Sequence, residues 1–217
     1  MSFDLCIFDL DGTLSDPRLG ITRAYQHALS AFGINADLAD RNDLIGPPLR
    51  QIFADLHGFS TPDVEKAVSK FREYFSITGL YENTIYTGIP ELLQFLIDNE
   101  KTLAVATNKV KLYSEEILKH FDLVKYFTFV SGDEMDGSLT QHGKRDIIKI
   151  VLDTLNAEGI LSAVMIGDRK HDIIGARENG ICSVGVTWGY GSLAELEEAG
   201  ATYIINTPDQ LQRFLCR

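Results

Sequence analysis

The chain is poor in cysteine. Its 217 residues include three cysteines, Cys6, Cys182 and Cys216, which lie far apart in the sequence. An odd number of cysteines without a CxxC pair excludes a disulfide framework and shows no zinc-binding spacing. The N-terminal residues contain no basic segment followed by an apolar one, so they show no signal peptide. These absences predict a cytoplasmic protein with reduced thiols.

Long apolar runs and clusters of basic residues are also missing. No apolar run approaches the roughly 18 residues that a membrane-spanning helix needs, so we expect no membrane partner. Lysine and arginine total 20 against 31 aspartates and glutamates, which gives a net charge of −11 at pH 7. A nucleic-acid surface needs clustered basic side chains to neutralise phosphates. We therefore expect no nucleic-acid partner, and an anionic substrate would need a local cation.

Short apolar segments typical of buried parallel strands recur along the chain. Helical patterns lie between most of these segments, and this alternation predicts an α/β fold with a doubly wound, Rossmann-like parallel sheet. In such a sheet, ligands bind at the carboxyl ends of the strands. The predicted strands lie at residues 5–10, 102–107, 127–130, 163–168, 183–187 and 202–206.

One connection is much longer than the others. The first predicted strand ends near Asp11, but the helix that leads to the second strand starts only near Ile89. A loop between a strand and a helix usually has about 2–6 residues. We therefore predict a core domain formed by residues 1–14 and 85–217, and a small, all-helical cap domain inserted at residues 15–84.

The insert has helical patterns of its own. We predict a first helix with Asp16 as its N-cap, Pro17 as its first residue and Gly33 at its end. Apolar residues at helical spacing predict two more helices, at residues 49–58 and 61–79. Their apolar faces could pack on one another.

Polar side chains follow the predicted strands. Because the ends of parallel strands meet at one edge of the sheet, these groups can converge. Two carboxylates about 4 Å apart repel by roughly 4 kcal/mol at an effective dielectric constant near 20, so a cluster of them calls for a cation. Mg²⁺ suits such a cluster, since it binds a few carboxylates and keeps waters that a phosphate can replace. The converging residues are Asp9 and Asp11, Thr107 and Asn108, Lys144, and Asp168 and Asp172.

The pair Asp9 and Asp11 predicts phosphoryl-transfer chemistry. The two residues are two positions apart, so they lie on the same side of an extended chain. One aspartate could attack phosphorus, and the other could protonate the leaving group and then deprotonate water. Thr107, Lys144 and backbone N–H groups would hold the phosphoryl oxygens.

The motifs "DLDGTLSD", "VATN", Lys144 and "GDRKHD", in this order, resemble those of the haloacid dehalogenase-like hydrolase superfamily. The insert resembles the helical cap of its phosphoglycolate phosphatase-like branch. The stretches "IGPPL", "GDRKHDIIGARENGI" and "GVTWGYGS" resemble a 5′-nucleotidase-like subgroup. The glycines of the last stretch do not form a phosphate-binding loop.

This resemblance implies a role for each converging residue. Gly12, Thr13 and Asn108 are expected to contact the substrate. Asp9 would be the nucleophile, and Asp11 would be the general acid and base. Thr107 and Lys144 would bind phosphate. Mg²⁺ would be held by Asp9, the Asp11 backbone carbonyl and Asp168, with Asp172 close by.

We therefore predict a Mg²⁺-dependent phosphatase of small phosphorylated metabolites, acting through a phosphoaspartate. The expected substrate is a nucleoside 5′-monophosphate or 2-phosphoglycolate, and the expected state is a monomer or a weak homodimer. Two alternatives stay open. One is a sugar phosphomutase similar to β-phosphoglucomutase, and the other is a non-enzymatic receiver module that is phosphorylated on aspartate.

Arg50 is the residue of the insert that we expect to bind the leaving group. It follows a stiff turn, Gly46-Pro47-Pro48, and has no obvious acidic partner in the sequence. We expect this turn to point into the cleft, where an arginine could distinguish one substrate from another.

Overall fold

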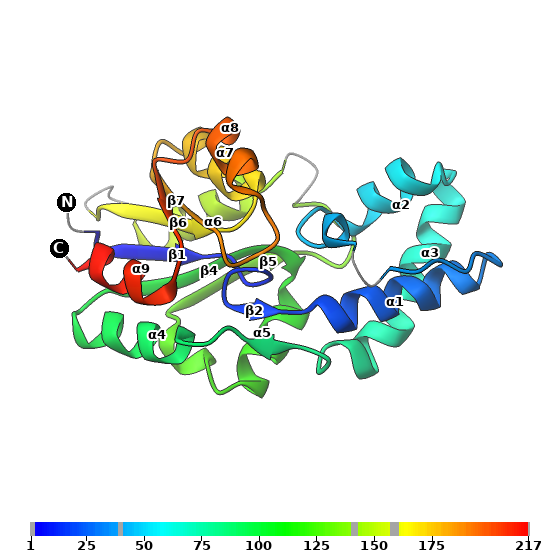
Figure 1. The fold of residues 1–217 in the computed structure, drawn as a ribbon, viewed down its shortest axis with the longest axis horizontal. Coiled ribbons are helices and arrows are strands. Elements are labelled where there is room, and N and C mark those ends of the chain that lie inside the picture. Colours follow the sequence, from blue (N-terminus) through cyan, green and yellow to red (C-terminus); the bar gives the residue numbers. More distant parts are fainter. Residues whose placement is uncertain (1–2, 39–40, 140–142, 157–160, 217) are drawn as a thin grey trace. The chain divides into compact units, whose positions relative to one another are not determined.

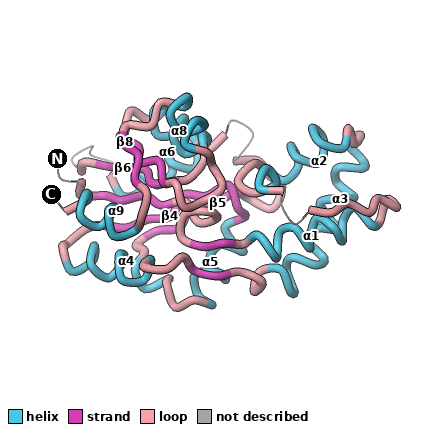
Figure 2. Tube along the Cα trace, in the orientation of Figure 1, coloured by secondary structure: helices cyan, strands magenta, loops and turns pink. Residues whose placement is uncertain are grey.

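The computed structural model describes residues 3–38, 41–139, 143–156 and 161–216. The chain divides into two compact units, one formed by Met1–Asp16 and Ile85–Arg217 and the other by Pro17–Thr84. Figure 1 shows the fold, and Figure 2 shows how helices and strands alternate along most of the first unit.

The first unit contains a six-stranded sheet whose strand order is β5-β4-β1-β6-β7-β8. Every neighbouring pair of strands is parallel. This arrangement confirms the predicted α/β fold with a doubly wound sheet. The strands are β1 (Leu5–Phe8), β4 (Thr102–Val110), β5 (Phe129–Asp133), β6 (Ala163–Gly167), β7 (Cys182–Val186) and β8 (Tyr203–Ile205).

Helices cover both faces of this sheet. Helices α4 (Ile89–Asp98) and α5 (Lys111–His120) lie on one face, and α6 (Arg145–Leu155) and α7 (Lys170–Glu178) lie on the other (Figure 1). Helix α8 (Leu193–Ala199) packs on α7, and α9 (Pro208–Leu215) packs on α4. None of the helices in the described part of the chain is long and apolar enough to cross a bilayer.

Strand β1 is the centre of the core. All four of its residues are buried, and Leu5 and Ile7 lie in one apolar cluster with Ile147, Ile148 and Val151 of α6. Side chains alternate between the two faces of a strand, so the remaining two residues of β1 face the other helical layer. Packing on both faces holds the end of this strand in place.

The order of the strands puts a topological switch point between β1 and β6. The connections from β1 lead to β4 and then β5, whereas those from β6 lead to β7 and then β8 in the opposite direction. Loops leave such a point on opposite sides and open a crevice at the carboxyl ends of the two strands. Asp9 directly follows β1, and Asp168 directly follows β6.

The second unit is built from three helices around an aromatic core. They are α1 (Arg18–Ser30), α2 (Leu49–His57) and α3 (Thr61–Tyr74), with a 3₁₀ turn, η1 (Asn42–Leu44), before α2 and a π-helical turn, η2 (Phe75–Gly79), after α3. The ring of Tyr25 lies 5.0 Å from those of both Phe53 and Phe71. Gly20 of α1 lies against the backbone of Gly79, where a Cβ atom would be 2.0 Å from the Gly79 carbonyl oxygen. This contact lets α1 and the end of the α3–η2 segment approach closely.

The prediction that Asp16 is the N-cap of the first helix of the insert is wrong. The N-cap is Pro17, and no side chain caps this helix. Asp16 belongs instead to the short strand β2 (Ser15–Asp16), which pairs with β3 (Thr84–Ile85). The carboxylate of Asp16 accepts a hydrogen bond from the hydroxyl of Tyr190, which lies 174 positions later in the chain. A contact so distant in sequence leaves no local signal.

Candidate active site

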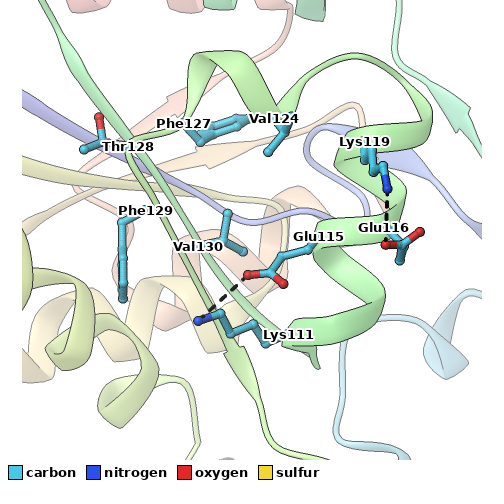
Figure 3. Close-up of a pocket in the computed structure, with 9 residues that line it drawn as sticks. All are labelled: Lys111, Glu115, Glu116, Lys119, Val124, Phe127, Thr128, Phe129 and Val130. Carbon is cyan, nitrogen blue, oxygen red and sulfur yellow. Dashed lines mark ion pairs between the residues drawn. The ribbon is translucent and has the colours of Figure 1, made fainter.

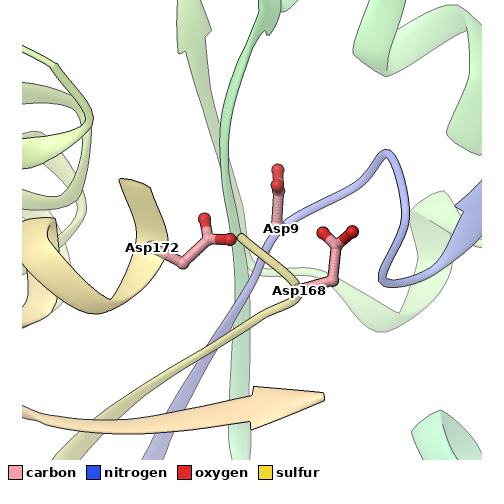
Figure 4. Close-up of side chains that lie close together, drawn as sticks. All are labelled: Asp9, Asp168 and Asp172. Carbon is pink, nitrogen blue, oxygen red and sulfur yellow. The ribbon is translucent and has the colours of Figure 1, made fainter. Parts of the chain in front are cut away.

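Three aspartates gather at the switch point of the sheet. Asp9 follows β1, Asp168 follows β6, and Asp172 lies in the first turn of α7; all three are buried. One carboxylate oxygen from each lies within 4.8 Å of the others, and Figure 4 shows the three side chains converging. The sequence predicted this convergence, and the geometry is that of a group able to share one cation.

Burial and mutual repulsion raise the pKa values of two of these carboxyl groups. The pKa of Asp168 is raised to about 8, mainly by desolvation and also by the charges of Asp172 and Asp9. Desolvation also raises the pKa of Asp172 to about 6, although Lys144 opposes it. Three buried carboxylates cannot all stay ionised at neutral pH without further positive charge.

Lys144 supplies part of that charge. It is the N-cap residue of α6, and its ammonium forms ion pairs with Asp172 and, at 2.7 Å, with Asp9. Its side chain is 1% exposed. Burial lowers the pKa of Lys144, but the charges of Asp172 and Asp9 outweigh this effect and the net pKa is raised. Lys144 therefore stays protonated, and its predicted contact with phosphate remains a prediction.

The carboxylate of Asp11 forms an ion pair with a different lysine, Lys109. Its Oδ2 lies 2.7 Å from Nζ of Lys109, and its Oδ1 is buried without a hydrogen-bond partner in the described part of the chain. Burial raises the pKa of Asp11, against the charge of Lys109. The Asp11 side chain is not one of the three that converge. This agrees with the expectation that Asp11 meets the metal through its backbone carbonyl, which remains a prediction.

The sequence indicated Lys109 only as an alternative to Lys144, together with Arg145 and Lys170, because all of them lie near strand ends. Lys109 comes directly after Thr107 and Asn108, at an irregularity in the pairing of β4 with β5 that falls between Thr107 and Val110. The irregular backbone changes which side the following side chains face, which the alternating pattern of a regular strand does not predict. The available signal was its position, next to predicted site residues at the end of a strand.

Two glycines and one threonine, Gly12, Gly167 and Thr13, let the loops lie close enough to form the site. Gly12 has a φ of +82°, and a Cβ atom there would lie 2.2 Å from Oδ2 of Asp168. A Cβ atom at Gly167 would lie 2.1 Å from Cγ of Asp172. The hydroxyl of Thr13 donates a hydrogen bond of 3.4 Å to Asp168. Gly12 and Thr13 therefore shape the carboxylate group, whereas their expected contact with substrate is untested.

Thr107 and Asn108 lie at the end of β4, the strand beside β1. Thr107 is buried, and its hydroxyl oxygen accepts a hydrogen bond of 3.3 Å from the backbone N–H of Lys109. Both residues thus stand at the predicted edge of the sheet. Their roles as phosphate and substrate ligands stay predictions.

The interpretation of Arg50 as a residue without an acidic partner is wrong. Its guanidinium makes two hydrogen bonds to the carboxylate of Glu65 on α3, of 2.7 and 3.0 Å. Both residues belong to the second unit. The partner is 15 positions away, beyond the range in which the sequence indicates a pair on one helix. A role for Arg50 in binding the leaving group stays a prediction.

One segment lies directly on the site although its sequence did not indicate this position. Residues 188–191, with the sequence WGYG, form a loop after β7 that touches Asp168. The backbone N–H of Tyr190 donates a hydrogen bond of 2.7 Å to Oδ2 of Asp168. Two glycines in four residues were the available signal, but they mark a close approach of the backbone to a carboxylate rather than to a phosphate.

The donor set of Asp9, Asp168 and Asp172 fits Mg²⁺. All three ligands are carboxylate oxygens, which a hard divalent cation prefers. Lys144 pairs with Asp9 and Asp172, but among the described residues Asp168 forms no ion pair, and its pKa is raised. A cation held by the three groups would offset the desolvation and the repulsion that raise this pKa.

A cavity of about 440 Å³ lies elsewhere in the first unit, between α5 and the edge strand β5 (Figure 3). Its apolar wall includes Phe127, Phe129 and Val130. Its lysines and glutamates pair along α5, Lys111 with Glu115 at 3.8 Å and Lys119 with Glu116 at 4.0 Å. These exposed pairs do not converge into a group of carboxylates, so we do not place the chemistry here.

Comparison with known proteins agrees with this geometry. A family model described as haloacid dehalogenase-like hydrolase matches residues 6–186. The chain is 45% identical over 200 residues to a 5′-nucleotidase of Pseudomonas aeruginosa, covering 91% of this chain and 88% of the relative. It is 35% identical over 218 residues to the tyrosine-protein kinase PtkA of Mycobacterium tuberculosis, covering 97% and 72% of the two chains.

A solved structure shares the whole fold. A crystal structure of a predicted phosphatase from Clostridium acetobutylicum superposes with a TM-score of 0.93 at 40% identity, and the match covers 99% of each chain. These findings confirm the predicted resemblance and the prediction of a hydrolase. The family match covers most of the chain and includes the strand ends that carry the buried carboxylates, so the chain belongs to the haloacid dehalogenase-like hydrolase family.

Proposed function

We propose that this protein is a Mg²⁺-dependent phosphatase that hydrolyses small phosphomonoesters through a phosphoaspartate at Asp9. The observation that carries this proposal is the buried group of Asp9, Asp168 and Asp172 at the switch point, with Asp11 two residues beyond Asp9. The family match and the relatives named 5′-nucleotidase and phosphatase support a phosphoric monoester hydrolase.

Asp9 is the candidate nucleophile because its carboxylate is held in one orientation. Its Oδ1 accepts a hydrogen bond of 2.7 Å from the N–H of Leu10, and its Oδ2 pairs with Lys144. In the proposed first step, a carboxylate oxygen of Asp9 forms a bond to phosphorus while the bond from phosphorus to the ester oxygen breaks. A positioned carboxylate loses little freedom in this step, which lowers its barrier.

Asp11 is the candidate acid and base because burial raises its pKa, which favours the protonated form needed in the first step. It would give its proton to the departing ester oxygen. In the second step it would take a proton from the water that attacks phosphorus and releases phosphate from Asp9. Lys109 lies against the same carboxylate and would stabilise it between the two steps.

The residues that would hold Mg²⁺ are Asp9, Asp168 and Asp172, together with the proposed Asp11 backbone carbonyl. When bound, Mg²⁺ would neutralise charge on the carboxylates and on the phosphoryl oxygens. Lys144 is placed to add a second positive charge beside Asp9, and Thr107 is proposed to donate a hydrogen bond to a phosphoryl oxygen.

The substrate that we favour is a nucleoside 5′-monophosphate, because the relative with 45% identity is named 5′-nucleotidase. 2-Phosphoglycolate, also predicted from the sequence, is the second choice. We propose that the helical unit Pro17–Thr84 acts as a cap domain that selects the substrate, since the carboxylate group can bind the phosphoryl group common to all candidates. A cytoplasmic location and a monomer or weak homodimer remain predictions from the sequence.

The test is a phosphate-release assay of the full chain with Mg²⁺. The panel contains nucleoside 5′-monophosphates, 2-phosphoglycolate, β-glucose 1-phosphate and a phosphotyrosine peptide. We expect repeated turnover with release of inorganic phosphate, and no release in EDTA. Conversion of β-glucose 1-phosphate to glucose 6-phosphate without release of phosphate would identify a phosphomutase instead. A single phosphorylation of the chain without turnover would identify a receiver module.

A further inference from the structure

The segment at residues 188–191 has no part in the chemistry proposed above, although it lies against the site. It comes directly after Thr187, beyond the carboxyl end of β7, the strand next to β6. Two of its residues make hydrogen bonds to the loops that carry the carboxylates, and its two glycines touch the same loops.

Tyr190 makes two hydrogen bonds that connect distant parts of the first unit. Its backbone N–H donates to Oδ2 of Asp168 at 2.7 Å. Its hydroxyl donates to Oδ1 of Asp16 at 2.5 Å. Asp16 is the last residue of the first unit before the chain enters Pro17–Thr84. One tyrosine therefore links a carboxylate of the proposed metal site to the residue at which the chain leaves this unit.

The two glycines leave this segment no room to move toward the site. A Cβ atom at Gly189 would lie 2.3 Å from the carbonyl oxygen of Gly12 and 2.4 Å from Oδ2 of Asp168. A Cβ atom at Gly191 would lie 1.8 Å from the carbonyl oxygen of Asp168. The backbone on both sides of Tyr190 is thus packed directly on the residue that its N–H orients.

Trp188 adds a third attachment. Its Nε1 donates a hydrogen bond of 3.0 Å to the carbonyl oxygen of Thr13, the residue whose hydroxyl donates to Asp168. Trp188 is also the single tryptophan of the chain. A change in this segment should therefore be visible in the tryptophan fluorescence.

We propose that Tyr190 is a positioning residue for the metal site, orienting Asp168 through its backbone N–H while its hydroxyl, bound to Asp16, holds that N–H in place. This inference rests on the proposed binding of Mg²⁺ by Asp9, Asp168 and Asp172. The need for such a residue follows from the charges. Asp168 is repelled by Asp9 and Asp172, and a carboxylate without a fixed donor would rotate away from them. Groups that orient a metal ligand change metal affinity although they do not touch the metal.

The experiment measures Mg²⁺ binding to the full chain without substrate. We compare the wild type with Tyr190→Phe, which removes the hydroxyl and keeps the backbone N–H. Calorimetric titration gives the Kd for Mg²⁺, and Trp188 fluorescence follows the same titration. The matched control is Tyr203→Phe, the same substitution at the first residue of β8, which pairs with Val184 in the middle of β7. We expect the Kd to rise about tenfold in Tyr190→Phe, the lower end of what such positioning groups contribute, and to stay within twofold in the control.

A second pair of variants tests the partner. Asp16→Asn keeps an oxygen that can accept from the hydroxyl, so its Kd should stay close to that of the wild type. Asp16→Ala removes the acceptor and should match Tyr190→Phe. Because the two groups form one hydrogen bond, the double variant Tyr190→Phe/Asp16→Ala should bind Mg²⁺ no more weakly than either single variant.

A merely structural role predicts a different pattern. If Tyr190 positions Asp168, saturating Mg²⁺ should bring the kcat of Tyr190→Phe back to that of the wild type. If Tyr190 only stabilises the fold, the Kd for Mg²⁺ should be unchanged, and the kcat of the variant should stay low in excess Mg²⁺. An unchanged Kd in both Tyr190→Phe and Asp16→Ala, beside a wild type that binds Mg²⁺, overturns this inference alone. A wild type that binds no Mg²⁺ overturns the proposed function, and the inference with it.

Discussion

Two of the regions in the first unit where a lysine pairs with a carboxylate differ sharply in their physical consequences. At the switch point, Lys144 and Asp9 are 1% and 6% exposed. Beside the α5 cavity, Lys111 and Glu115 are 44% and 46% exposed. Exposed pairs contribute only about 0–1 kcal/mol to stability, because water screens them and their side chains lose entropy on pairing. Buried charges interact strongly and shift pKa values. The comparison teaches that burial, more than residue type, separates a reactive cluster from an ordinary surface.

The largest expected effect comes from removing the buried cation. Lys144→Met leaves Asp9 and Asp172 without their partner, and breaking a buried ion pair in this way costs about 3–5 kcal/mol. We expect that loss in the free energy of unfolding, measured by urea denaturation in EDTA. The matched control is Lys111→Met, which removes the exposed lysine beside the α5 cavity. It should change the free energy of unfolding by no more than about 0.5 kcal/mol. Equal effects at the two positions would contradict the contrast.

Replacing the nucleophile should have the next largest effect. Asp9→Asn turns a carboxylate into an amide, which is a poor nucleophile, and removes one charged ligand of the proposed metal. We expect kcat for the best substrate to fall by at least about a hundredfold, since positioned groups of this kind usually contribute that much each. Glu115→Gln makes the same kind of change beside the α5 cavity and should leave kcat unaltered. Substantial activity of Asp9→Asn would rule out Asp9 as the nucleophile.

The pH dependence of stability should also differ between the two regions. The pKa of Asp168 in the folded protein is raised to about 8, above its ordinary value of 3.8, so the folded state binds more protons between these limits. Stability therefore falls as pH rises from about 4 to 8. We expect the melting temperature of the metal-free wild type, relative to that of Asp168→Asn, to decrease over this range.

Mg²⁺ should remove that dependence. A cation bound to Asp168 favours its ionised form, so the two melting profiles should no longer diverge with rising pH once Mg²⁺ is saturating. Bound Mg²⁺ at a hundred times its Kd should also stabilise the wild type by about 2.7 kcal/mol. A metal-free profile parallel to that of Asp168→Asn would mean that Asp168 is not perturbed by its neighbours.

The smallest effect is expected in the second unit. Arg50 pairs with the half-exposed Glu65, so Arg50→Ala should change the free energy of unfolding by less than about 1 kcal/mol. If Arg50 also binds the leaving group, kcat/KM for the best natural substrate should fall roughly tenfold, because a charged hydrogen bond is lost. Hydrolysis of p-nitrophenyl phosphate should barely change. Glu65→Ala serves as the control, and a matching loss of activity there would assign the effect to the ion pair instead.

Much of the fold could be predicted because its signals are local. Buried parallel strands are short and apolar, and the helices between them bury apolar residues at a spacing of three or four, as in Ile147, Ile148 and Val151. The length of the connection after Asp11 indicated an inserted unit. The convergence of Asp9, Asp168 and Asp172 followed from one rule of topology, that the ends of parallel strands share an edge.

The contacts that could not be predicted are those between side chains far apart in the sequence. Glu65 as the partner of Arg50 and Lys109 as the partner of Asp11 depend on how helices pack and on an irregular strand end. The WGYG segment was noted for its glycines, but its contact with Asp168 joins residues of two different loops.

By itself, therefore, the sequence determined the order of strands and helices, the presence of an inserted helical unit and the convergence of Asp9, Asp168 and Asp172, because each depends on local spacing or on a motif. Only the tertiary structure decided which charged groups form ion pairs with one another. In the folded chain, Lys144 forms ion pairs with both Asp9 and Asp172. Burial raises the pKa of Asp168, and Tyr190 makes hydrogen bonds to both Asp168 and Asp16. These effects depend on distance and desolvation, which residues acquire only once the chain has packed.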